Sequence, residues 1–246
     1  MLVSFSDSNV FGELDSSISS IEKVKIIAIH GWGRTRSDLL KSLRGLPVLS
    51  IDLPGHGSSP KPQMPLGARE LAKLINSCLE EKDLSDVIVV GHSLGGRVGI
   101  CLAAEYPNRI KAFVGTGVPL IRKKVKPSLK YRVIKKLNKL NIISNKKLEL
   151  MRNKTGSQQY RHTSGVIREM FVKLVNESYE AELLELKCPV RFIWGENDSE
   201  ATLAQARESI GLIESDATLE VIPERGHNLC KEIDEKLVGA VNEFLV

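Results

Sequence analysis

The sequence lacks a long hydrophobic run, a repeat of fixed period and a low-complexity tract. A membrane-spanning helix needs about 18 or more consecutive apolar residues, and no segment approaches that length. The stretch 1–20 has neither a basic start nor an apolar core and contains acidic residues, so it does not resemble a secretory signal peptide. These absences favour an ordinary globular protein of the cytoplasm, without a transmembrane segment.

Cysteine is also scarce. The four cysteines lie far apart and without the spacing of a metal site, which argues against a disulfide framework and favours free thiols in a reducing compartment. Hydrophobic residues make up 42% and charged residues 26% of the chain, as in a globular protein with a real core. We expect no metal and no organic cofactor.

Short apolar runs alternate with helical patterns along the chain. The runs are rich in Val and Ile and close on Gly, Pro or Asp, which is typical of buried parallel strands. Strict alternation predicts an α/β protein with a mostly parallel central sheet and helices on both faces. The predicted strands are 23–30, 46–53, 86–92, 110–118, 189–195 and 217–223, and the predicted helices are 66–82, 94–105, 202–212 and 231–244.

One interval breaks the alternation. From 120 to 186 the pattern is only helical, which predicts a helical lid that stands off the sheet. The predicted organisation is therefore a core in two parts, 1–119 and 187–246, with the lid at 120–186 between them.

The motif GHSLGGR at 91–97 follows the apolar run DVIVV without a gap. In a G-x-S-x-G sequence between a strand and a helix, the glycines allow a sharp turn that leaves the serine exposed at the carboxyl edge of the sheet. The pattern predicts Ser93 as a nucleophile. The alternative is that Ser93 only caps the following helix and that the glycines serve close packing.

Five motifs in order along nearly the whole chain are similar to those of the α/β-hydrolase superfamily, and most similar to its serine carboxylesterases. The resemblance implies a helical lid after the sixth strand and a triad of Ser93 as nucleophile, Asp198 as acid and His227 as base. The hairpin that usually precedes the first motif is short here, so its strands are in doubt. The motifs are HGWG at 30–33, DLPGHGSS at 52–59, GHSLGG at 91–96, WGEND at 194–198 and GHN at 226–228.

Chemistry supports the same acid and base. A base must reach the serine hydroxyl, and His227 follows a predicted strand and a glycine, as expected for a loop at that sheet edge. Asp198 is favoured over Glu196 as the carboxylate that holds the imidazole, although Asp198 could instead only cap the helix that begins near 201. The four remaining histidines, His30, His56, His92 and His162, are interpreted as structural.

A tetrahedral oxyanion needs donors that are already in position, and backbone N–H groups usually supply them. Leu94, the first residue after the nucleophile, offers one at the start of a helix. The resemblance implies the second from Trp32 in HGWG, whose side chain would line the acyl pocket unless it serves ordinary packing. Asp52, Pro54 and Gly55 are expected to shape a turn.

The predicted lid is strongly basic. Between Ile121 and Lys147 there are eleven Lys or Arg residues and no Asp or Glu, although the net charge of the chain is only +5. The basic side chains are either a solvated face or a docking surface for an acyl carrier protein, a coenzyme A ester or an anionic membrane surface. Nucleic acid is not expected, because aromatic residues do not interleave with the basic ones. The candidate docking residues are Arg132, Lys135, Lys136 and Lys139.

These patterns predict a hydrolase that cleaves a carboxylic ester or thioester through an acyl-enzyme on Ser93. HGWG and the basic lid are similar to esterases that act on the methyl ester of pimeloyl-carrier protein. GHSLGGRV, WGENDS and GHN are similar to the synthases of menaquinone biosynthesis that eliminate pyruvate, in which a basic residue at the position of Arg97 helps to hold an acidic substrate. The alternatives are therefore such a lyase, with Arg97 either binding substrate or lying on the helix surface, and a receptor that retains the triad.

Overall fold

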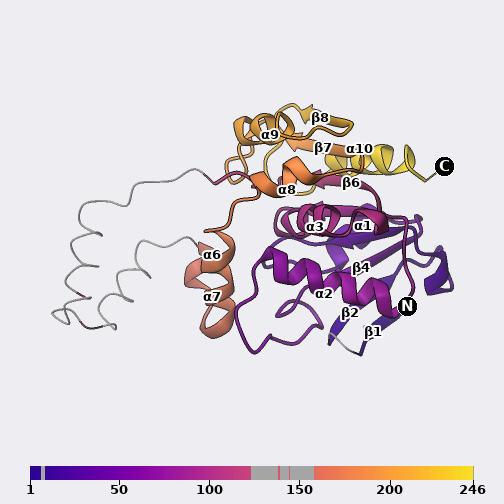
Figure 1. The fold of residues 1–246 in the computed structure, drawn as a ribbon, viewed down its shortest axis with the longest axis horizontal. Coiled ribbons are helices and arrows are strands. Elements are labelled where there is room, and N and C mark those ends of the chain that lie inside the picture. The colour runs from indigo at the N-terminus through magenta and orange to yellow at the C-terminus, as the bar shows by residue number, and fades with distance from the viewer. Residues whose placement is uncertain (7–8, 123–137, 139–143, 145–157, 246) are drawn as a thin grey trace.

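The computed structural model describes residues 1–6, 9–122, 138, 144 and 158–245. Its centre is a sheet of eight strands in the order β1-β2-β4-β3-β5-β6-β7-β8 (Figure 1). β1 and β2 form an antiparallel hairpin at one edge and β2 pairs antiparallel with β4, whereas all other neighbours are parallel. The strands are β1 Leu2–Phe5, β2 Val10–Leu14, β3 Ile26–Ile29, β4 Val48–Asp52, β5 Val87–His92, β6 Ile110–Thr116, β7 Val190–Gly195 and β8 Ala217–Ile222.

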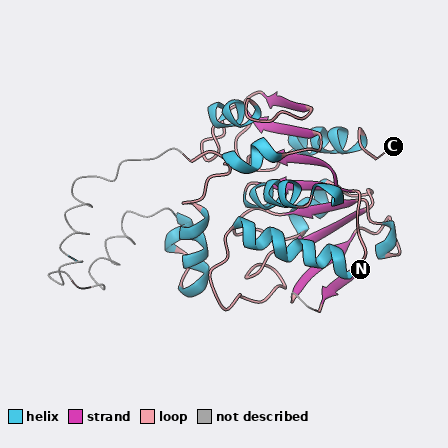
Figure 2. Cartoon of the chain, viewed as in Figure 1, coloured by secondary structure: helices cyan, strands magenta, loops and turns pink. Residues whose placement is uncertain are grey.

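Helices cover both faces of this sheet (Figure 2). Successive side chains of a strand point to opposite faces, so Val89 of β5 joins the core beneath α2, α3, α8 and α9, while Val90 joins the core beneath α1 and α10. The chain thus builds the predicted α/β architecture, with two apolar layers. The helices are α1 Ser37–Ser42, α2 Ala68–Glu81, α3 Leu94–Glu105, α6 Gln158–Arg161, α7 Gly165–Leu174, α8 Glu180–Glu185, α9 Leu203–Ile210 and α10 Lys231–Asn242.

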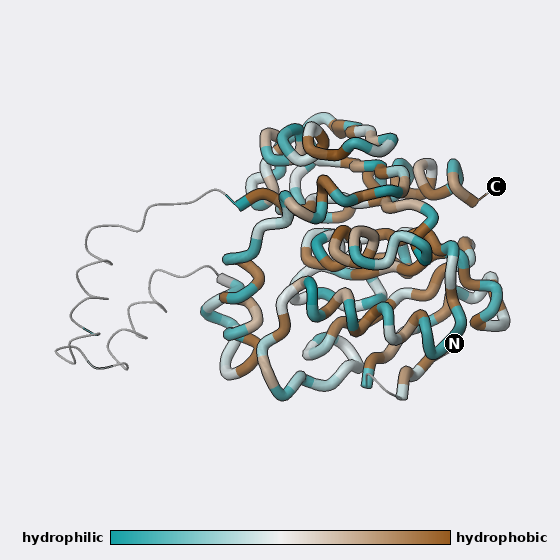
Figure 3. The backbone as a smooth tube through the Cα atoms, in the orientation of Figure 1, coloured by the Kyte–Doolittle hydropathy of each residue, from teal (hydrophilic) through white to brown (hydrophobic). Residues whose placement is uncertain are grey.

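Hydrophobic and hydrophilic residues alternate along the helices (Figure 3), as expected for helices that bury one side against a sheet. In α2, for example, Leu71, Ile75 and Leu79 are fully buried. Within the described ranges, no helix has the length and apolar character needed to cross a membrane.

Two elements differ from the sequence-based expectation. The N-terminal hairpin, whose strands were in doubt, forms as β1 and β2 because Phe5, Val10 and Leu14 are buried against the sheet. The helix α1 was not predicted, since six residues are too few to display a helical period.

The predicted lid is described only in part. Residues 158–186 contain the helices α6, α7 and α8 and no strand. The docking candidates Arg132, Lys135, Lys136 and Lys139 lie outside the described residues. The boundaries of the two core parts and the lid therefore stay a prediction.

Candidate active site

The turn between β5 and α3 holds Ser93 in a conformation that non-glycine residues seldom adopt, with φ 51° and ψ −109°. The neighbouring glycines make this turn possible. A Cβ on Gly91 would lie 2.6 Å from the Cα of Gly96, and a Cβ on Gly95 would collide with the carbonyl group of Ile29. The sharp turn therefore depends on the absence of side chains around Ser93.

His227 lies between Ser93 and Asp198. Its Nε2 is 3.1 Å from the Ser93 Oγ, and its Nδ1 is 2.8 Å from Oδ2 of Asp198. The three residues follow β5, β7 and β8, and the carboxyl ends of parallel strands meet at the same sheet edge. A proton on Nδ1 that is donated to the carboxylate leaves Nε2 free to accept the serine hydroxyl proton.

The two oxygens of Asp198 have different partners. While Oδ2 faces His227, Oδ1 accepts hydrogen bonds from the backbone N–H groups of Glu200 at 2.9 Å and Ala201 at 2.8 Å. The buried carboxylate can thus cap the turn before α9 and orient the imidazole at the same time. The competing carboxylate, Glu196, instead accepts from the backbone N–H of Glu224 at 3.1 Å.

Two buried histidines hold the loops around this site. His30 donates from Nδ1 to the Gly31 carbonyl at 2.7 Å and accepts at Nε2 from the Leu53 N–H at 3.0 Å. His92 Nε2 donates to the carbonyl of His227 at 3.0 Å. Burial lowers the pKa of each imidazole to about 4, so both are neutral near pH 7.

The other two histidines occupy contrasting places. The His56 ring lies 5.2 Å from the His30 ring and 5.1 Å from the Trp32 ring, measured between ring centroids, and burial lowers its pKa. His162 follows α6 and is exposed. Neither histidine has a polar contact with Ser93 or Asp198 in the described structure.

A pocket of about 420 Å³ opens beside Ser93. The Trp32 side chain lines this pocket, and its ring centroid lies 5.3 Å from that of Phe171 in α7. That the pocket holds an acyl group stays a prediction. Four lining residues could not be predicted from the sequence, because they reach the pocket only through tertiary packing: Gln159, Phe171, Leu174 and Glu200. The lining residues are Trp32, Ser93, Leu94, Arg97, Pro119, Gln159, Phe171, Leu174, Val175, Glu200 and His227.

The candidate oxyanion donors flank the same pocket. Leu94 is the first residue of α3, so its backbone N–H has no acceptor in a preceding helical turn. Trp32 lies in the loop after β3, whose course is held by the two hydrogen bonds of His30. Both residues line the pocket that Ser93 faces.

Arg97 does not lie on an exposed helix surface. Its half-buried side chain lines the pocket, where Nε donates to the Pro119 carbonyl at 3.0 Å and Nη1 donates to the Leu174 carbonyl at 3.1 Å. The hydroxyl of Tyr179 also hydrogen-bonds the guanidinium, and burial lowers the pKa of Arg97. Its hydrogen-bond partners are carbonyls and a hydroxyl, and the Glu177 carboxylate acts on it through its charge. Because arginine stays protonated in proteins, Arg97 brings a positive charge to a pocket wall that also includes the Glu200 carboxylate.

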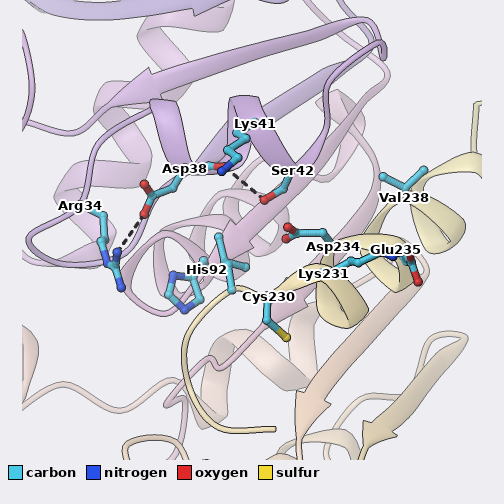
Figure 4. A pocket seen from close by; sticks show the side chains of 11 residues that line it. Arg34, Asp38, Lys41, Ser42, His92, Cys230, Lys231, Asp234, Glu235 and Val238 are labelled. Carbon is cyan, nitrogen blue, oxygen red and sulfur yellow. Dashed lines mark hydrogen bonds and ion pairs between the residues drawn. The ribbon is translucent and has the colours of Figure 1, made fainter.

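A larger hollow of about 710 Å³ lies between α1 and α10 (Figure 4). His92 reaches it, but neither Ser93 nor His227 is among its lining residues. Its charged side chains include the pairs Arg34–Asp38 at 3.5 Å and Lys231–Glu235 at 3.8 Å. The candidate nucleophile and base therefore belong to the smaller pocket.

The turn after β4 is built around Asp52. Its buried carboxylate accepts from the backbone N–H groups of Arg36 at 2.7 Å and Ser58 at 2.8 Å, and it pairs with the Arg36 guanidinium. Gly57 has φ +52° and packs against this carboxylate, where no side chain would fit. These contacts agree with the expectation that the DLPGHG segment shapes a turn.

Comparison with known proteins finds relatives among the hydrolases. The family model for the alpha/beta hydrolase fold matches residues 26–138. A pimeloyl-[acyl-carrier protein] methyl ester esterase of Neisseria meningitidis is 35% identical over 92 residues, covering 36% of this chain and 34% of the relative. A probable serine hydrolase of Drosophila melanogaster is 31% identical over 114 residues, covering 42% and 34% respectively. The matched parts thus span about a third of each relative.

Solved structures extend the likeness to the whole chain. The crystal structure of a hydrolase from Pseudomonas aeruginosa has a TM-score of 0.71 at 20% identity and covers 100% of this chain and 97% of that chain. This likeness concerns the fold. Together with the family model and the sheet topology, it shows that the chain has the α/β-hydrolase fold. Among its relatives are proteins named as esterases and serine hydrolases.

Proposed function

We propose that this protein is a serine hydrolase that cleaves a carboxylic ester or thioester through an acyl-enzyme on Ser93. The observation that carries the proposal is the continuous hydrogen-bonded series from Ser93 through His227 to Asp198 at the edge of a pocket. The named esterases and serine hydrolases among the relatives support hydrolysis as the reaction class.

In the proposed first step, the Ser93 Oγ attacks the carbonyl carbon while His227 Nε2 takes the hydroxyl proton. The carbonyl oxygen becomes an oxyanion, which the backbone N–H groups of Leu94 and Trp32 would stabilise. His227 then gives its proton to the leaving oxygen as the bond from that oxygen to the acyl carbon breaks. Water repeats the sequence against the acyl-enzyme, which releases the acid and restores the Ser93 hydroxyl.

A lyase of the menaquinone-synthase type is the second candidate, because Arg97 lines the pocket with a positive charge. The hydrolase and the lyase differ in whether they hydrolyse esters over many catalytic cycles. We expect the purified protein to hydrolyse p-nitrophenyl esters over many catalytic cycles, with a maximum at one acyl length, measured as release of p-nitrophenol. No turnover of any ester or thioester would contradict the hydrolase, and would favour the lyase or a receptor that retains the triad.

An acidic substrate is also part of the proposal. Arg97 offers a charge at the pocket wall, and the basic residues Arg132, Lys135, Lys136 and Lys139 would add a long-range attraction for an acidic acyl carrier. The relatives named for an acyl-carrier-protein ester support this class of partner. The small number and wide spacing of the cysteines support a reducing, cytoplasmic location.

The two charges predict different kinetic signatures. Arg97→Gln is expected to lower kcat/KM for an ester with a free carboxylate on its acyl chain by roughly tenfold to a hundredfold relative to its neutral analogue, the range for a charge-assisted hydrogen bond.

Replacing the four basic residues Arg132, Lys135, Lys136 and Lys139 with Glu is expected to raise KM for a carrier-bound methyl ester, with an effect that shrinks as salt is added. Equal losses on acidic and neutral esters in either variant would contradict the corresponding proposal.

A further inference from the structure

Two hollows meet at Ser93 and His227. The pocket of about 420 Å³ has a mainly apolar far wall, formed by Phe171, Leu174 and Val175. The other hollow, of about 130 Å³, shares Trp32, Ser93, Gln159, Glu200 and His227 with it and adds Gly31, Arg34, His92 and Asn228. One side of the nucleophile is therefore apolar and roomy, and the other is polar and small.

The position of the proton donor, His227, bears on where the alcohol and acyl parts of an ester bind. The leaving oxygen must receive its proton from His227 Nε2, so the departing alcohol lies on the side of that nitrogen. Glu200 Oε2 is 3.9 Å from this nitrogen, and Asn228 follows His227 directly in the chain. His227 and Glu200 line both hollows, so this nitrogen lies where the two meet. The apolar wall of the larger pocket suits an acyl chain, and the small polar hollow suits the alcohol.

Glu200 is the strongest hydrogen-bond acceptor of the small hollow. Across the described part of the chain, no Lys or Arg forms an ion pair with Glu200, and Nε2 of His227 lies 3.9 Å from its Oε2. The Arg34 guanidinium is instead engaged with the Asn228 Oδ1 at 2.7 Å and with Asp38 at 3.5 Å. The amide groups of Gln159 and Asn228 add hydrogen-bond donors, so the walls present both donors and an acceptor.

We propose that this hollow is a leaving-group subsite that selects a short alcohol with a second hydroxyl group, and that Glu200 is its specificity-determining residue. A hydroxyl is both donor and acceptor, which matches the mixed wall, and the volume fits an alcohol of a few heavy atoms. In the reaction, His227 protonates the ester oxygen that leaves, while the second hydroxyl donates to Glu200 and remains unchanged. The inference rests on the proposed hydrolase.

The test compares two esters of nearly the same shape, 2-hydroxyethyl butyrate and propyl butyrate. We expect the wild-type protein to favour the hydroxyl-bearing ester in kcat/KM by roughly tenfold, the size of one charge-assisted hydrogen bond at a half-exposed carboxylate. Glu200→Ala should bring the ratio close to one. Glu200→Gln, which keeps the shape and a weaker, neutral acceptor, should give an intermediate ratio.

Glu208→Ala is the matched control, because Glu208 is an exposed carboxylate on α9 outside both hollows. This variant should keep the wild-type ratio. A wild-type ratio near one, or the same ratio in the wild-type, Glu200→Ala and Glu200→Gln proteins, overturns the subsite and leaves the hydrolase in place. No turnover of either ester by the wild-type protein overturns the proposed function itself, and the subsite with it.

Discussion

Replacing Ser93 with alanine is expected to lower kcat for ester hydrolysis by about 10⁴-fold or more. The variant loses the atom that forms the acyl-enzyme, and no other hydroxyl in the described structure is hydrogen-bonded to His227 Nε2. Residual activity would come only from substrate binding and from the oxyanion donors. The measurement is kcat under saturating p-nitrophenyl ester, with protein folding checked by thermal unfolding.

Ser77→Ala is a suitable control for this change. Ser77 is exposed on α2, where its hydroxyl donates to the Lys73 carbonyl of the same helix at 3.2 Å. Its replacement should leave kcat at the wild-type value. If Ser93→Ala retained more than roughly a tenth of the wild-type activity, the acyl-enzyme mechanism would be wrong.

Replacing His227 with alanine is expected to cost nearly as much as the loss of Ser93. Without the imidazole, the Ser93 hydroxyl has no base at 3.1 Å and the leaving oxygen has no proton donor. Members of such a triad act as a unit, so their losses do not add. The Ser93→Ala/His227→Ala double variant should therefore be about as slow as either single variant, measured as kcat on the same ester.

His162→Ala supplies the comparison for this prediction. His162 is an exposed histidine that follows α6, and its removal should leave turnover intact. A double variant that lost the product of the two single factors would argue against a shared mechanism. A small loss of kcat in His227→Ala alone would indicate that another residue acts as the base.

Much of the fold was predictable because its strands are strongly apolar. The run DVIVV becomes β5, whose six residues are all buried, and fully buried strands carry a clear sequence signal. The hairpin of β1 and β2 was left in doubt, since its burial alternates over only four and five residues. The helix α1 was missed because its short pattern includes a single fully buried residue, Leu39.

Part of the candidate site could be predicted from the sequence, and part could not. Ser93 and His227 lie 134 residues apart, yet each follows a strand of a parallel sheet, so their shared edge could be predicted from their order. The positions of Arg97 and Glu200 could not. Arg97 faces a pocket because α7 supplies the opposite wall through Leu174, and Glu200 approaches His227 only through the turn that Asp198 caps. Such contacts depend on how separate segments pack.

Covalent labelling shows directly whether the Ser93 hydroxyl is an activated nucleophile. The protein is incubated with a fluorophosphonate and analysed as intact protein and as peptides by mass spectrometry. We expect one adduct per chain, located on Ser93, and none in Ser93→Ala or in the denatured protein. Ester turnover by a protein that is not labelled at Ser93, or labelling at a different residue that abolishes turnover, would contradict it.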